Sequence, residues 1–154
     1  MTDVQNLMEA IDGSIDAIIE DLIEIRHDIH THPELGYNET RTSKLIQTFL
    51  DDASIEYVPD LAKGTGVLAH IPGNADQAIA LRADMDALPI LEENDFAWKS
   101  VHEGCMHACG HDGHTTILLG TAKVLSTLAA EHELPNPVSF VFQPAEEGGG
   151  GGKE

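Results

Sequence analysis

The order of helical and strand-like segments along the chain is the feature that most constrains its fold. Apolar residues recur at helical spacing from Val4 to Ile23, and Pro33 ends this stretch. The spacing predicts one long amphipathic helix or two short ones. A further helix is expected over about residues 39–51, with Asn38 as a cap that satisfies its first backbone N–H groups. The first third of the chain is therefore predicted to be helical.

Strand-like segments follow at residues 67–71 and 78–83, and the Pro-Gly-Asn loop between them suits neighbouring strands. A mostly apolar helix is expected over residues 113–130, and the apolar run at 137–143 is typical of a buried strand. The order helix, helix, strands, helix, strand predicts one layered α/β domain over residues 1–154. In such domains, binding and catalytic groups gather where strands end and loops begin.

Composition excludes some classes of partner. The chain has 154 residues, of which 42% are hydrophobic, so it is long enough to bury one core. Its 27 acidic and 8 basic residues give a net charge of −19, which repels nucleic acid and anionic membranes. The N-terminal stretch has neither the basic flank nor the apolar run of a secretory signal, and no segment is long and apolar enough to span a bilayer. We therefore expect a cytoplasmic protein without a nucleic-acid or membrane partner.

The stretch MHACGHDGHTT, which begins at Met106, concentrates metal-binding side chains. Cys109 and His111 lie two residues apart in a loop that contains Gly110 and Gly113, which lets a thiolate and an imidazole converge on one ion. The alternative is a His-rich loop that only caps the helix after it. Clustered Cys and His ligands favour a transition-metal site, and in it Asp112 is expected to orient a ligand or cap the helix.

Two adjacent acids, Glu146 and Glu147, follow the last predicted strand and precede five glycines. A hydrolytic metal site needs a base as well as ligands, because water must give up a proton at neutral pH. Side chains that are adjacent on extended backbone diverge, so one carboxylate can bind the metal while its neighbour holds the water. The alternative is a pair of solvated surface acids. A third acidic turn, Asp84 and Asp86, ends the strand predicted at 78–83.

These motifs, in this order, resemble the N-acyl-amino-acid amidohydrolases, which include hippurate hydrolase and the indole-acetyl-amino-acid hydrolases, within the aminoacylase and carboxypeptidase group of metallopeptidases. The resemblance covers nearly everything from Arg26 onward. It runs through RHDIHTHPELGYNET (26–40), GTGVLAHI (64–71), LRADMDALPILE (81–92), MHACGHDGHTTILLG (106–120) and FQPAEEGGGG (142–151).

The resemblance implies a layered α/β/α catalytic domain with a binuclear site that holds two divalent metal ions, zinc or manganese, or alternatively cobalt or nickel. Such a site hydrolyses the amide bond of an N-acyl amino acid or a peptide-like substrate. By motif position, Cys109, His111 and Glu147 are the implied metal ligands and Glu146 the general base. Asp84 is implied to orient a ligand.

The same resemblance implies that related peptidases place a His-x-Asp pair where this chain has Arg82 and Asp84. Arg82 is permanently cationic and cannot bind a metal ion. This substitution is typical of the amidohydrolase branch that has a cysteine ligand. His27, His30 and His32, which lie near Pro33, are interpreted as a structural turn at the end of a helix.

Length is the main departure from the family. The resemblance implies a longer chain with an inserted lid and dimerisation domain, and two further histidine ligands beyond residue 154. We therefore expect an N-terminal portion of the catalytic domain, which is active only with a complementary C-terminal half or through self-association. There are two alternatives. The first is a metal-binding fragment without turnover or one half of a split enzyme, and the second is a structural α/β module that binds no metal.

Overall fold

The computed structural model describes residues 3–154 and has the predicted mixture of helices and strands. The helices are α1 (Asp3–Asp16), α2 (Ile19–Thr31), α3 (Thr40–Asp52) and α4 (His111–Glu131), and the strands are β1 (Glu56–Leu61), β2 (Gly66–Ile71), β3 (Ile79–Asp84) and β4 (Val138–Gln143), with short 3-10 turns at Ala62–Gly64 and Gly151–Lys153. The α/β fold class is confirmed.

The four strands form one mixed sheet in the order β1-β2-β4-β3. β2 pairs antiparallel with β1 and β4, whereas β3 runs parallel to β4. The expectation that β2 and β3 are neighbours is wrong, because β4 lies between them although it is last in the sequence. Since β3 and β4 are parallel, their carboxyl ends meet at one edge of the sheet, where Asp84 pairs with Gln143.

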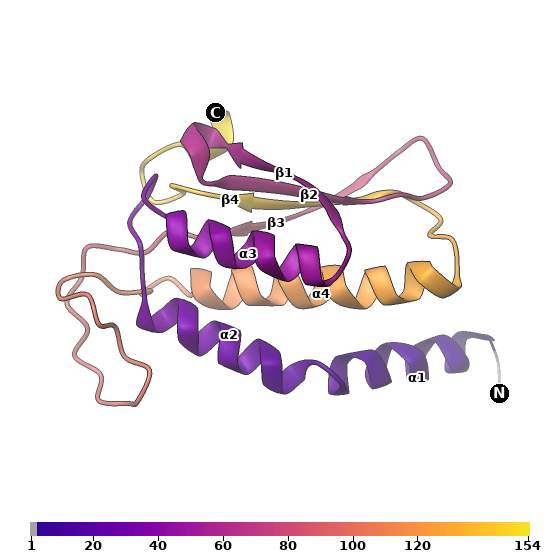
Figure 1. Ribbon diagram of the computed structural model, residues 1–154, viewed down its shortest axis with the longest axis horizontal. Helices are drawn as coiled ribbons and strands as arrows, with labels where there is room; N and C mark the ends of the chain where they lie inside the picture. The colour runs from indigo at the N-terminus through magenta and orange to yellow at the C-terminus, as the bar shows by residue number, and fades with distance from the viewer. Residues whose placement is uncertain (1–2) are drawn as a thin grey trace.

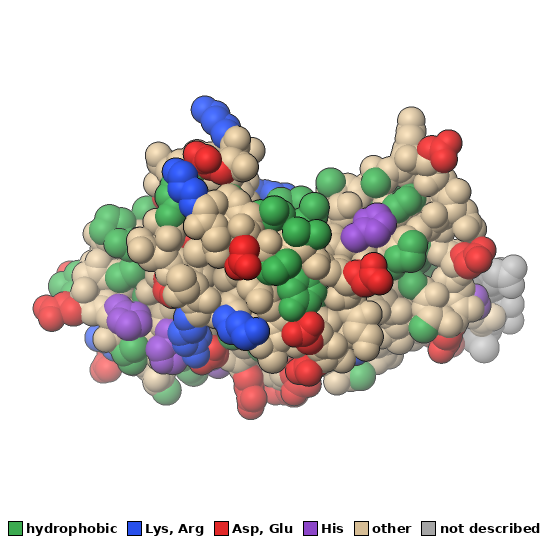
Figure 2. All heavy atoms as spheres, turned by 45° about the horizontal axis from the view of Figure 1, so that its top comes forward, with side chains coloured by type: hydrophobic (Ala, Val, Ile, Leu, Met, Phe, Trp, Pro, Cys, Tyr) green, Lys and Arg blue, Asp and Glu red, His purple; other side chains and the backbone are tan. Residues whose placement is uncertain are grey.

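All four helices lie on one side of the sheet (Figure 1). α3 and α4 pack on the strands, and α1 and α2 pack on α4. Of the three layers of the implied α/β/α arrangement, the described residues form two: the sheet and the helices on one side of it. Figure 2, in which the top of Figure 1 is turned toward the viewer, shows hydrophobic, acidic, basic and histidine side chains together on the visible face. Among residues 3–154, no helix combines the length and the apolar character needed to cross a membrane.

The core lies between the sheet and the two helices that cover it. Alternate residues of β4, Val138, Phe140 and Phe142, are buried and point toward the helices. Leu119 of α4 and Ile46 of α3 are fully buried against them. Alternation in the strand and helical spacing in α3 therefore build the same core, and burial of this apolar area fixes the register of β4.

The first helical stretch forms two helices, which is one of the two predicted possibilities: it is divided at Ala17 and Ile18 into α1 and α2, and Gly13 lies within α1. One local detail differs from the sequence expectations. Asn38 is not the cap of α3, because Glu39 occupies that position and its side chain makes no capping bond. The side chain of Glu34 performs this task from a preceding turn by accepting the N–H groups of Arg41 (3.0 Å) and Thr42 (2.8 Å).

Candidate metal centre

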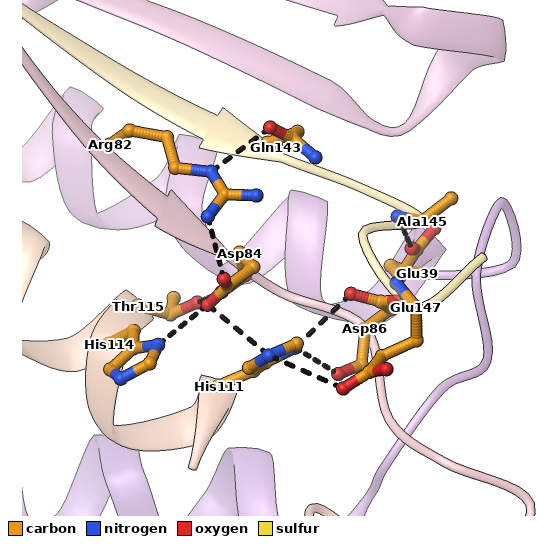
Figure 3. Close-up of polar contacts among 10 residues, drawn as sticks. All are labelled: Glu39, Arg82, Asp84, Asp86, His111, His114, Thr115, Gln143, Ala145 and Glu147. Carbon is orange, nitrogen blue, oxygen red and sulfur yellow. Dashed lines mark hydrogen bonds and ion pairs between the residues drawn. The ribbon is translucent and has the colours of Figure 1, made fainter. Parts of the chain in front are cut away.

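The candidate site lies at the shared carboxyl edge of β3 and β4 (Figure 3). Asp84 ends β3, the turn that carries Glu146 and Glu147 follows β4, and His111 begins α4 next to both. Gly110 precedes α4 with a left-handed φ of 82°, which glycine adopts without strain, so the loop can turn into the helix at this point. Three segments that are distant in sequence therefore meet at one edge.

His111 is the centre of this arrangement and is 4% exposed. Its Nδ1 lies 2.8 Å from the backbone oxygen of Asp86 and 3.2 Å from Oδ1 of the same residue. Both partners are acceptors, so Nδ1 carries the proton and donates it. Nε2 faces the other way, 3.6 Å from Oδ1 of Asp84 and 3.9 Å from Oε1 of Glu147.

Asp86 holds two parts of the site together. Its carboxylate contacts His111 and also accepts the backbone N–H of Glu147 through Oδ2, at 2.9 Å. The side chain is buried, with 2% exposed. The resemblance implies that Asp84 orients a ligand. In the structure Asp84 accepts from Nδ1 of His114, and the carboxylate that contacts Nδ1 of His111 is that of Asp86. Asp84 and Asp86 are two residues apart at the end of β3, and the sequence does not indicate which of the two carboxylates contacts His111.

Two groups of side chains place potential ligand atoms within 4.8 Å of one another: Cys109, His111 and Glu147, and also Asp84, His111 and His114. The first group is the set of ligands predicted from the sequence. Both groups use His111, whose Nδ1 is occupied by Asp86, so they share Nε2 and are alternative environments for one ion. His114 belongs to the His-rich stretch that begins at Met106, where its own role was left open, and its Nδ1 donates to Oδ1 of Asp84 at 2.7 Å.

The chemistry of this donor set fits a transition-metal ion. A ring nitrogen, a thiol and carboxylate oxygens converge, which is the mixture of ligands that zinc and its neighbours accept. Burial tends to raise the pKa of Asp84, but the hydrogen bond from His114 and the charges of His111 and Arg82 outweigh it and lower this pKa. Asp84 is therefore an anion at neutral pH, and it faces Nε2 of His111. A cation between these atoms would be stabilised by all of them.

Cys109 is exposed. Its hydrogen bond to Glu147 raises the pKa of its thiol, and partial loss of solvent and the charges of nearby carboxylates raise this pKa further. Without a cation the thiol keeps its proton. A bound metal ion would reverse this preference, since the thiolate is the form that coordinates metal. Cys109 and Glu147 thus form a pair that a proton or a metal ion can bridge.

Glu146 is exposed, and its side chain makes no hydrogen bond within residues 3–154.

Two of the histidines near Pro33, which are interpreted as part of a structural turn, contact groups outside the candidate site. His30 has 3.0 Å contacts to Asp112 and Glu92, and Nδ1 of His32 donates to the backbone oxygen of Asp28. Asp112 also accepts Nε of Arg26 at 3.3 Å. Asp112 thus joins the beginning of α4 to α2, and its role next to the candidate ligand His111 is structural in this geometry.

Residues 80–154 match the family model described as peptidase family M20/M25/M40. Over 133 residues the chain is 50% identical to an uncharacterized hydrolase of Staphylococcus saprophyticus, which covers 86% of this chain and 34% of that protein. An uncharacterized hydrolase of Staphylococcus epidermidis is 50% identical over 126 residues, which are 82% of this chain and 32% of the relative. The chain spans about a third of the length of these relatives.

Solved structures have the same fold. A dinuclear metal binding peptidase of the M20 family from Bacillus subtilis superposes with a TM-score of 0.79 at 46% identity, over 86% of this chain and 37% of that one. An aminobenzoyl-glutamate utilization protein from Klebsiella pneumoniae gives a TM-score of 0.67 at 25% identity, over 90% of this chain and 40% of that one. The described α/β layers therefore match 37% of a dinuclear metal binding peptidase of the M20 family.

Proposed function

We propose that this chain is the N-terminal portion of the catalytic domain of an M20-family metal-dependent hydrolase and that it cleaves the amide bond of N-acyl amino acids. The observation that carries the proposal is the convergence of Cys109, His111 and Glu147 at the carboxyl edge of β3 and β4. The similarity to a dinuclear metal binding peptidase supports it. Hydrolysis is the reaction named for the relatives, whereas the acyl substrate is an inference from the motifs.

Each residue has a distinct task in this proposal. Cys109, His111 and Glu147 hold a divalent ion, which when bound polarises a carbonyl group and lowers the pKa of water. Asp86 keeps the proton of His111 on Nδ1 and so leaves Nε2 free to coordinate. Glu146 extends into solvent beside the ligand Glu147, where its carboxylate accepts a proton from water and passes it to the leaving amine.

A second ion needs ligands beyond those assembled around His111, because both clusters depend on the same ring nitrogen. The family resemblance implies two further histidines in a complementary portion of the enzyme. The chain covers 34% of the length of one relative, so the whole active site is proposed to form with that portion or through self-association. The second candidate function is metal binding without turnover. The short coverage of the relative favours it for the chain on its own, because the two further histidines are implied to lie in the complementary portion.

Metal content and hydrolysis of hippurate or N-acetyl amino acids, measured on the purified chain with zinc or manganese, test the proposal. Cys109→Ala should remove most of the bound metal. Cys105→Ala is the matched control, because its thiol contacts the backbone oxygen of Pro33 and lies outside both ligand groups. Glu146→Gln should keep the metal and abolish any turnover.

Three results separate the candidate functions. Turnover that is lost in Glu146→Gln establishes a catalytic chain. Metal held through Cys109 without turnover supports the metal-binding function. No stoichiometric metal in the unaltered chain contradicts both and leaves a structural module.

A further inference from the structure

Glu39 is a fully buried carboxylate that belongs to neither ligand group, with 0% of the residue exposed. Acidic side chains are seldom buried to this extent unless they are paired. Here the partners are neutral donors. Oε1 accepts the backbone N–H of Ala145 at 2.8 Å, and Oε2 accepts the hydroxyl of Thr65 at 3.0 Å. Burial raises the pKa of Glu39, and these hydrogen bonds oppose the rise.

The partner of Glu39 has an unusual backbone conformation. Ala145 has a φ of 51°, in the left-handed region that a residue with a Cβ rarely occupies. Such a conformation persists only where its surroundings hold it. Ala145 directly precedes Glu146 and Glu147, so its backbone angles decide the direction in which both carboxylates leave the strand.

Two buried carboxylates from distant segments hold this turn (Figure 3). Glu39 accepts the N–H of Ala145, and Asp86 accepts the N–H of Glu147 at 2.9 Å. The segment next to Glu39 also packs on the turn. A Cβ at Gly36 would lie 3.0 Å from Cα of Ala145, and the hydroxyl of Tyr37 donates to the backbone oxygen of Gly149 at 2.7 Å.

We propose that Glu39 is a positioning residue that holds Ala145 in its left-handed conformation and thereby directs Glu147 toward the candidate ligands Cys109 and His111. The functional half of this inference rests on the proposed function, since it assigns Glu147 to the metal. The structural half, that Glu39 fixes the turn, is independent of any metal. Glu39 touches no candidate ligand atom and acts only through the backbone.

The test compares Glu39→Ala and Glu39→Gln in the full chain. The amide oxygen of glutamine can still accept the N–H of Ala145, so this isosteric variant should behave like the unaltered chain. Alanine leaves that N–H without an acceptor. In Glu39→Ala we expect amide hydrogen exchange at Ala145 and Glu147, followed by NMR, to be at least about tenfold faster, with Ala69 in β2 unchanged. We expect Co²⁺ affinity to fall about 10–100-fold.

Glu34→Ala is the matched control. Glu34 caps α3 from the same segment and makes no contact with the turn, so its loss should lower stability without changing exchange at Ala145. Glu39→Asp is the second variant if Glu39→Ala does not fold. It keeps the charge but is one methylene shorter, and it should give the same change in exchange and affinity to a smaller degree.

Exchange at Ala145 and Glu147 that is unchanged in a folded Glu39→Ala or Glu39→Asp overturns the inference. Faster exchange with unaltered Co²⁺ affinity also overturns it, because the turn would then not position a ligand. If the unaltered chain binds no Co²⁺, the proposed function fails, and the exchange rates alone decide whether Glu39 holds the turn.

Discussion

Asp86 shows how one side chain can fix two others. It accepts from Nδ1 of His111 and from the backbone N–H of Glu147, so it sets the tautomer of one candidate ligand and the place of another. The aspartate-rich end of β3 could be recognised from the sequence as part of a site. Which aspartate contacts His111 could not, because that depends on how α4 is seated against the strand.

Asp86→Asn should weaken Co²⁺ binding about 10–100-fold while the chain stays folded. Asparagine keeps the shape of the side chain but has a single acceptor oxygen, so it cannot serve both donors. Isothermal titration with Co²⁺ measures the change. Asp95→Asn, at an exposed position of the 85–110 connection, is the control and should bind as the unaltered chain does. Equal affinities for the two variants would show that Asp86 does not support the site.

Glu92 and His30 form a buried ion pair that makes stability depend on pH. Burial tends to raise the pKa of Glu92, but the Ser100 N–H, Asn94 and His30 lower it to about 2. Burial tends to lower the pKa of His30, yet Glu92 and Asp112 outweigh it and raise this pKa. A lowered carboxylate pKa contributes stability above its unfolded value, and a raised histidine pKa contributes stability below its unfolded value.

The pair should therefore stabilise the fold most between about pH 4.5 and about pH 6.5, with losses on both sides. We expect Glu92→Gln to reduce the free energy of unfolding by on the order of 2 kcal/mol at about pH 5.5 and by less at about pH 3. Urea unfolding of both proteins across this range measures the difference. Glu93→Gln, at the exposed neighbouring position, should have no such pH-dependent effect. A constant difference from about pH 3 to about pH 5.5 would contradict the linkage.

At the scale of elements, patterns within short segments of the sequence predicted most of the helices and strands. The helices α2, α3 and α4 and the strands β2, β3 and β4 follow from apolar spacing and from the positions of Pro and Gly. β1 was not predicted, since EYVPDL contains a proline and lies at the sheet edge with most residues exposed. The insertion of β4 between β2 and β3 was not predicted either, because strand order depends on contacts between distant segments.

The loop between β2 and β3 passes close to the segment that leads into β4. A Cβ at Gly73 would lie 2.2 Å from the backbone carbon of Asn136, and backbone atoms cannot move aside cheaply. Gly73→Ala should lower the free energy of unfolding by about 1–3 kcal/mol through overpacking. Chemical denaturation measures the loss.

Gly13→Ala is the matched comparison, because nothing lies within 4 Å of a Cβ built at Gly13. This residue is inside α1, where alanine favours the helix, so the variant should gain about 0.5–1 kcal/mol. Changes of opposite sign in the free energy of unfolding of the two variants would show that the contact at Gly73, and not the loss of a glycine as such, causes the destabilisation. A Gly73→Ala chain as stable as the unaltered one would place the loop farther from Asn136.

At the scale of the whole molecule, the candidate site was easier to predict than the order of the sheet. Residue type and the family resemblance predict Cys109, His111 and Glu147 as ligands, and the structure brings their potential ligand atoms together. Their roles stay predictions until metal is measured. Glu39 gave no signal, because an isolated glutamate before a helix is ordinary in sequence, and only the fold shows that it is buried against Ala145.

The charge of the molecule leads to a prediction about salt. The net charge is −19, and no lysine or arginine occurs before Arg26. Acidic residues are close neighbours on the same helices, at Glu9, Asp12 and Asp16 in α1 and at Glu20, Asp21 and Glu24 in α2. Like charges three or four residues apart each cost about 0.2–0.5 kcal/mol, and the cost decreases as salt screens them.

Raising NaCl from about 0.1 M to about 1 M, which shortens the screening length from about 10 Å to about 3 Å, should therefore raise the urea midpoint of this chain. A double variant, Asp12→Asn with Glu24→Gln, should be more stable at low salt and gain less from added salt, since part of the repulsion is already gone and neither residue lies in the first turn of its helix. Asp28→Asn is the control, because Asp28 is paired with Arg41 at 2.7 Å and its loss should not reproduce this gain. A midpoint that falls with salt would mean that attractive pairs such as Asp28–Arg41 outweigh the repulsion among the acids.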